Sequence, residues 1–164
     1  MIFGMTTSTY TLIHVLISLV GIVSGLVVMF GLLSGKALNG WTAIFLATTV
    51  ATSVTGFGFP FHKLEPPHIV GIISLVVLAI AIVARYAFHL AGGWRATYVV
   101  TAMIALYLNV FVLVVQAFGK IAALKALAPK QSEPPFVITQ AAVLVLFIVL
   151  SILATKRFRI VGIR

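Results

Sequence analysis

Long apolar runs separated by short polar turns make up most of this sequence. Five such runs lie at residues 12–33, 41–57, 69–90, 96–118 and 136–155. A helix that crosses about 30 Å of hydrocarbon needs about 20 apolar residues, because each residue adds about 1.5 Å. The pattern therefore predicts an all-α fold, a polytopic transmembrane helical bundle of about five spans.

The connections between the runs are short, and two of them end in proline pairs. Pro66-Pro67 stands one residue before the third run, and Pro134-Pro135 stands directly before the fifth. Proline lacks the N–H that a helix interior needs, so a helix does not continue through such a pair. Connections of this length leave no room for a separate soluble domain. We expect residues 1–164 to form a single integral-membrane domain.

Composition and charge favour the same class. The chain is 62% hydrophobic and 8% charged, with a mean hydropathy of +1.25, whereas a soluble domain of this length needs far more charge. A net charge of +9 would suggest nucleic acid in a soluble protein, but these cations lie in turns and in the tail. We therefore expect the partners to be the lipid bilayer, with anionic lipids at the basic C-terminus, and not nucleic acid.

The cations also predict an orientation. Seven fall on one side of the expected spans and four on the other. Because cytoplasmic loops of membrane proteins are enriched in lysine and arginine, we expect the N-terminus outside and the C-terminus in the cytoplasm. The larger group is Lys36, Arg85, Arg95, Lys156, Arg157, Arg159 and Arg164, and the smaller is Lys63, Lys120, Lys125 and Lys130.

Small residues in the first run point to close helix packing. His14, Ser18, Gly21 and Gly25 recur at helical spacing, so they share one helix face. Glycines four residues apart let two helices approach closely in lipid. We expect this face to be buried in the bundle.

Polar side chains in later runs have two interpretations. Thr48, Thr52 and Thr55 lie in the second run and Asn109 in the middle of the fourth. Hydroxyls in lipid usually bond a carbonyl of their own helix, and an amide without a partner costs several kcal/mol there. We prefer the interpretation that these side chains pack between helices. The alternative is that they line a path for a small solute. Arg85 ends a run of apolar residues, so we expect its stem to reach outward to the interface.

Short matches recur in order along the chain. His14 precedes Trp41 by 27 residues, and His68 precedes Trp94 by 26. Internal repeats are common in membrane proteins, although other matches in this chain have different offsets. A tandem pair of two-span hairpins is one interpretation, in which the two histidines occupy equivalent places.

The histidines are the main candidates for cofactor chemistry. His14 and His68 are expected on different helices at one membrane depth, which is what bis-histidine ligation of haem b requires. Gly21, Gly25 and Gly71 would leave room for the ring.

A metal site is a further candidate in the turn before the third run. His62, His68 and Glu65, together with His14, offer the donor atoms that zinc or copper binds. The other interpretation is that the polar side chains of this turn are simply solvated.

Enzymatic chemistry has little support in the sequence. The chain has no cysteine, no Gly-x-Ser-x-Gly motif, no His-Glu-x-x-His motif and no paired carboxylates. Neither of the two carboxylates lies inside an apolar run, which also disfavours a proton-coupled carrier. We expect a protein that is not an enzyme.

The segments ATTVATSVTGFGFP (47–60), PHIVGIISL (67–75) and QSEPPF (131–136) resemble uncharacterised small bacterial inner-membrane proteins. The likeness covers nearly the whole chain. It implies a multi-pass protein of the bacterial inner membrane and carries no activity or site residues.

The leading expectation is thus a non-catalytic binding or accessory subunit. It would pack against a larger membrane complex, or a second copy, through the glycine face of the first span. Electron transfer by haem b with His14 and His68 is one alternative. A passive small-solute path beside Thr48, Thr52, Thr55 and Asn109 is the other.

Overall fold

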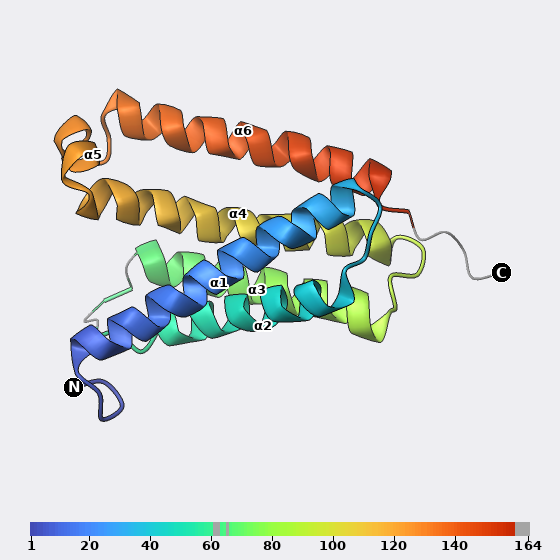
Figure 1. Cartoon of the computed structure of the whole chain (residues 1–164), viewed down its shortest axis with the longest axis horizontal. Helices are drawn as coiled ribbons and strands as arrows, with labels where there is room; N and C mark the ends of the chain where they lie inside the picture. Colours follow the sequence, from blue (N-terminus) through green and yellow to red (C-terminus); the bar gives the residue numbers. More distant parts are fainter. Residues whose placement is uncertain (61–62, 65, 160–164) are drawn as a thin grey trace.

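The structure, a computed structural model, describes residues 1–60, 63–64 and 66–159. It is an all-α bundle whose long helices run back and forth between two ends (Figure 1). Its elements are α1 (Thr7–Leu33), α2 (Asn39–Gly56), α3 (Pro66–Ile82), the π-helix η1 (Val83–Ala87), α4 (Trp94–Lys120), the short α5 (Ala122–Leu127) and α6 (Pro134–Arg157). The predicted fold class is confirmed.

Among the described residues, four segments are long and apolar enough to cross a membrane: Thr7–Leu33, Pro66–Ala87, Trp94–Lys120 and Pro134–Arg157. These correspond to four of the five expected spans. The remaining one, α2, forms a helix in the expected place but does not meet the same test, because five of its 18 residues are threonine. At about 1.5 Å per residue α2 is about 27 Å long, slightly less than the hydrocarbon thickness.

Local signals set several helix ends. The Thr6 hydroxyl accepts the N–H of Thr9 at 3.2 Å and caps α1. Both proline pairs begin helices, α3 at Pro66 and α6 at Pro134, because proline fits the first helical turn, where its missing N–H is not needed.

Glu133 organises the turn that leads into α6. Its carboxylate accepts the backbone N–H groups of Lys130 (3.2 Å) and Ser132 (3.1 Å). Desolvation raises the pKa of Glu133, but these backbone donors outweigh it and leave the pKa below the usual glutamate value.

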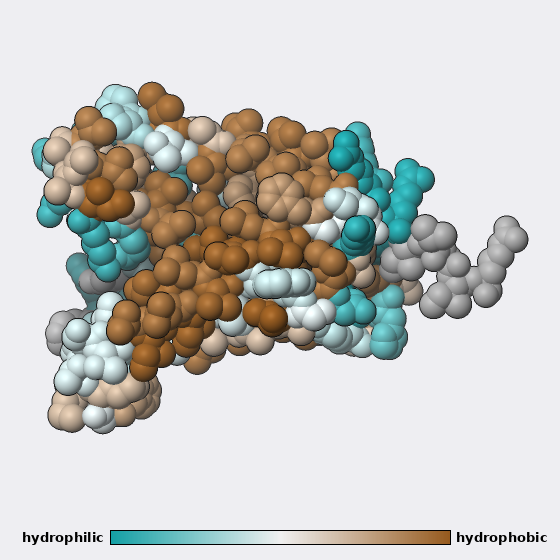
Figure 2. Space-filling model, in the orientation of Figure 1, coloured by the Kyte–Doolittle hydropathy of each residue, from teal (hydrophilic) through white to brown (hydrophobic). Residues whose placement is uncertain are grey.

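The core lies around α4, which contacts every other helix of the bundle. Tyr98, Val99, Ala105 and Leu106 of α4 are almost completely buried. The face seen in Figure 2 is an apolar band with hydrophilic residues toward its two ends. This distribution is the one expected where lipid surrounds the middle of the bundle and water its ends.

The two ends differ in charge. The histidine end contains the start of α1, the end of α2 and the start of α3, and the arginine end contains η1, the start of α4 and the end of α6 (Figure 1). Six of the seven cations expected on one side lie at or beside the arginine end: Lys36, Arg85, Arg95, Lys156, Arg157 and Arg159. Arg164, the seventh, lies outside the described residues.

Candidate functional site

The histidine end holds His14 in a defined hydrogen-bonded position. His14 Nδ1 lies 2.7 Å from the hydroxyl of Thr55, which is itself 2.7 Å from the carbonyl of Ala51. Because a hydroxyl has one proton and the Ala51 carbonyl only accepts, the Thr55 oxygen accepts from His14 Nδ1–H. The lone pair of His14 is therefore on Nε2.

Aromatic rings surround this histidine. The Tyr10 hydroxyl donates to the Thr55 carbonyl at 2.7 Å. The Phe59 ring packs edge-on against both Tyr10 (5.0 Å between centroids) and His14 (5.3 Å). A Cβ at Gly58 would collide with the Tyr10 hydroxyl, so this close approach requires glycine.

His68 lies at the same end of the bundle, at the start of α3. Its side chain is buried, and its ring lies 5.9 Å from that of Phe57. The Phe57 ring also contacts α3 at Gly71, where an added Cβ would be 3.2 Å away. Each histidine therefore contacts the end of α2 or the residues directly after it. His14 and His68 thus lie at the same end of the bundle, as expected. Ligation of haem by these two histidines stays a prediction.

The candidate metal site falls largely outside what the structure describes. His62 and Glu65 are not among the described residues. Within residues 1–60, 63–64 and 66–159, no three histidine or acidic side chains come together in a way that could hold a metal ion. A zinc or copper site that uses His62, Glu65 and His68 therefore stays a prediction.

The threonine face of α2 packs as expected. The hydroxyls of Thr48, Thr52 and Thr55 donate to the carbonyls four residues earlier, at 2.7, 2.8 and 2.7 Å. Asn109 Nδ2 donates to the Thr49 hydroxyl at 3.3 Å, which joins α4 to α2. The expected bond from Asn109 to another helix is confirmed, and a solute path along this face stays a prediction.

The glycine face of α1 is buried inside the chain. A Cβ on Gly25 would lie 2.6 Å from Leu106 and 2.9 Å from Phe45. A Cβ on Gly21 would lie 3.3 Å from the hydroxyls of Thr48 and Thr49. Internal packing is thus confirmed. The expectation that a partner packs on this glycine face is wrong, because α2 and α4 of the same chain already occupy it.

Arg85 departs most from the expectation drawn from sequence. It is 7% exposed and does not reach outward. Its Nη2 donates to Oδ1 of Asn39 at 2.6 Å, and its guanidinium lies over the ring of Tyr98, 5.1 Å from the centroid. The reason is that Arg85, in η1, lies beside the start of α2, where the Asn39 amide and the Ala37 carbonyl offer it acceptors within the bundle.

The hydrogen-bonding capacity of Arg85 is only partly used. Arg85 Nη1 and the Tyr98 hydroxyl are both buried without a hydrogen bond of ordinary geometry among the described atoms. The chain has only two carboxylates: Glu133 is at the far end of α6, and Glu65 directly precedes α3 in sequence. A buried cation held by an amide and an aromatic face is costly. No residue pattern around Arg85 in the sequence indicated this contact with Asn39.

These features define a membrane-spanning α-helical bundle with a polar, histidine-containing end and a strongly basic end. No protein-family model, curated protein or solved structure matches the chain.

Proposed function

We propose that the protein is a non-catalytic accessory subunit of the bacterial inner membrane, which binds another transmembrane chain through the outer face of α6. The excess of cations at the arginine end favours a cytoplasmic C-terminus by the positive-inside rule. The resemblance to small bacterial inner-membrane proteins favours that location.

The position of α6 carries the proposal. Only 6% of its most apolar 18-residue window is buried inside the bundle, against 28–44% for the other three candidate spans. Phe147 and Ala154 are its buried side chains. Helices in lipid gain stability from close packing and not from leaving water. A helix with so little packing in its own chain is the one that gains most from a partner.

The outer face of α6 is suited to such packing. Ile138, Ala142, Val145 and Val149 are exposed and recur at the spacing of one helix face. They lie opposite the buried Phe147 and Ala154. Ala142 is small enough at the centre of this face to allow a second helix close. We call these four residues the outer face of α6.

Site-specific photo-crosslinking in native membranes tests the proposal. A crosslinker at Val145, which is 59% exposed, should give one discrete protein adduct, and Ala142→Trp should abolish it. A crosslinker at Val76 of α3, 57% exposed, is the matched control and should give only lipid adducts. Adducts of equal yield from both positions, or none from Val145, would contradict the proposal. Two differently tagged copies distinguish a second copy from another protein.

A second candidate, electron transfer by haem b, is favoured by the hydrogen bonding of His14. A ligating histidine commonly donates its other ring N–H to a fixed acceptor, and Thr55 is such an acceptor for Nδ1–H. Oxidised and dithionite-reduced visible spectra of protein from haem-replete cells test this. A Soret band lost in His14→Ala and His68→Ala would support it, and no band in the wild type would exclude it.

A further inference from the structure

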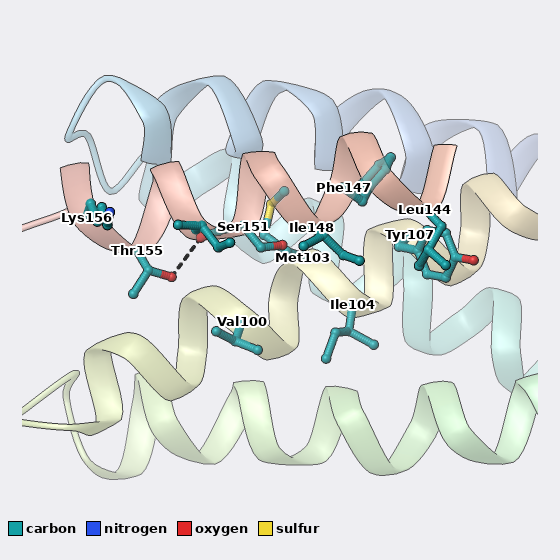
Figure 3. Close-up of a pocket in the computed structure, with 11 residues that line it drawn as sticks. Val100, Met103, Ile104, Tyr107, Leu144, Phe147, Ile148, Ser151, Thr155 and Lys156 are labelled. Carbon is teal, nitrogen blue, oxygen red and sulfur yellow. Dashed lines mark hydrogen bonds between the residues drawn. The ribbon is translucent and has the colours of Figure 1, made fainter. Parts of the chain in front are cut away.

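An open groove runs along the bundle between α4 and α6 (Figure 3). Its volume is about 490 Å³. Its walls are apolar, with Val100, Met103 and Ile104 on one side and Leu144, Phe147 and Ile148 on the other. The Thr155 hydroxyl at one end donates to the Ser151 carbonyl at 2.8 Å, so it adds little polarity to the groove.

A basic crevice begins where this groove ends. It has a volume of about 600 Å³ and is lined by Arg95, Lys156 and Arg159, together with Leu90, Gly92 and Thr155. Arg95 is held in place because its Nη1 donates to the carbonyls of Thr155, at 2.8 Å, and Phe158. Lys156 and Arg159 are exposed and extend the positive charge toward solvent.

The groove and the crevice form one continuous site, because Thr155 and Lys156 line both. The groove follows α6 from Leu144 to Lys156, a rise of twelve residues or about 18 Å. One leaflet is about half of the 30 Å hydrocarbon core. The site thus has an apolar part about one leaflet long and a cationic part at the level of the headgroups.

The shape and lining of the groove favour one kind of occupant. The groove is open along one side, about 18 Å long and lined almost entirely by apolar side chains. A single hydrocarbon chain, which needs no polar partner, fits such a groove.

Charge decides the headgroup. Three cations line the crevice, and Glu133, the acidic side chain that the structure describes, lies at the other end of α6. An anionic group from outside the chain is the complementary partner. We propose that the groove and crevice bind one anionic phospholipid, with an acyl chain between α4 and α6 and its phosphate against Arg95, Lys156 and Arg159.

This site is separate from the outer face of α6, so it stands independently of the proposed accessory function. Each cation near a phosphate is worth about 1 kcal/mol, or about fivefold in affinity. Replacing Lys156 and Arg159 together should therefore weaken binding by about 25-fold. Arg95 is left in place because it also anchors the end of α6.

Lipid retention by the purified full-length protein in mild detergent, measured by native mass spectrometry, tests the proposal. Phosphatidylglycerol and phosphatidylcholine with identical acyl chains are the two probes. The wild type should retain phosphatidylglycerol preferentially, and Lys156→Gln/Arg159→Gln should lose this preference. Ile148→Trp, which fills the groove at a half-exposed position, should reduce the retention of both lipids.

Matched controls keep the charge and bulk changes but move them elsewhere. Lys120→Gln/Lys125→Gln removes two exposed cations at the opposite end, and Val76→Trp adds bulk on α3. Both should retain lipid as the wild type does. The proposal is overturned if the Lys120/Lys125 variant loses the preference equally, or if Ile148→Trp has no effect. It is also overturned if glycerol phosphate displaces the lipid at equal concentration, because the groove would then contribute nothing.

Discussion

The contact between Asn39 and Arg85 allows a test in which two substitutions at one position have opposite effects. Asn39 Oδ1 accepts from Arg85 Nη2 at 2.6 Å, and Arg85 is 7% exposed. Glu133, the carboxylate that the structure describes, lies at the opposite end of the bundle, at the start of α6. Asn39→Asp would place a negative charge against this buried cation. Asn39→Ala would remove the acceptor and leave the cation less satisfied. We therefore expect the first to stabilise the fold and the second to destabilise it.

The magnitudes follow from two known contributions. A hydrogen bond to a charged group is worth about 1.5–3 kcal/mol, and a carboxylate at a helix N-terminus adds about 0.3–1 kcal/mol. Asn39 is the first residue of α2 and is itself exposed, so solvent screening reduces both. We expect Asn39→Asp to raise the free energy of unfolding by about 1 kcal/mol, and Asn39→Ala to lower it by about 1–2 kcal/mol.

Equilibrium unfolding of the purified protein in mixed micelles of mild detergent and increasing sodium dodecyl sulfate measures these changes. Arg85→Met provides the control, because it removes the cation and keeps most of the volume. The gain from Asn39→Asp should disappear in the Arg85→Met background. An equal gain in both backgrounds would refute the electrostatic reasoning and leave the helix N-terminus as its cause. No gain in either would refute the contact itself.

Three further predictions concern packing and capping. Gly25→Ala should cost about 1–3 kcal/mol, because its Cβ would meet Leu106 at 2.6 Å, whereas Gly40→Ala, with nothing within 4 Å, should be neutral or stabilising in the same unfolding assay. Tyr10→Phe should cost about 1 kcal/mol by removing the bond to the Thr55 carbonyl, also measured by unfolding. Since the folded pKa of Glu133 is lowered, its stabilisation is complete above the unfolded value of about 4.3 and is lost as the pH falls through the lower folded value. The protection factors of the backbone amides of Lys130 and Ser132 against hydrogen exchange, taken relative to the intrinsic rate at each pH, should therefore fall only in acid, and in Glu133→Gln they should be low at every pH.

The helices could be predicted from sequence because their cause is local. A chain in hydrocarbon must satisfy its own backbone hydrogen bonds, so the length of an apolar run is enough to predict a helix. The proline pairs at 66–67 and 134–135 marked two helix starts, although α3 and α6 begin at the first proline of each pair, two or three residues before the expected runs. A hydrogen bond from Asn109 to another helix could also be predicted, since an amide in mid-membrane needs a partner. The sequence did not indicate that Thr49 is that partner.

Contacts that depend on two distant segments could not be predicted. A glycine face on α1 can pack on any helix, and only the folded chain shows that Phe45 and Leu106 cover Gly25. The inward position of Arg85 depends on η1 and on the start of α2, which precedes Arg85 by 46 residues. Snorkelling, the usual behaviour of an arginine at the end of a span, was the reasonable expectation. It failed because the bundle offers Arg85 an acceptor and an aromatic face.

Two arginines show how this chain tolerates its positive charge with so few carboxylates. Arg85 uses the amide of Asn39, and Arg95 uses the carbonyls of Thr155 and Phe158 at the end of α6. Carbonyls at a helix C-terminus carry partial negative charge, which favours a cation there. Lys156 and Arg159 lie at the same end but contribute exposed charge to the crevice. The exposed cations that line the crevice therefore lie where the apolar groove reaches the end of the bundle. The anionic phospholipid that we propose would complement both the apolar groove and these cations.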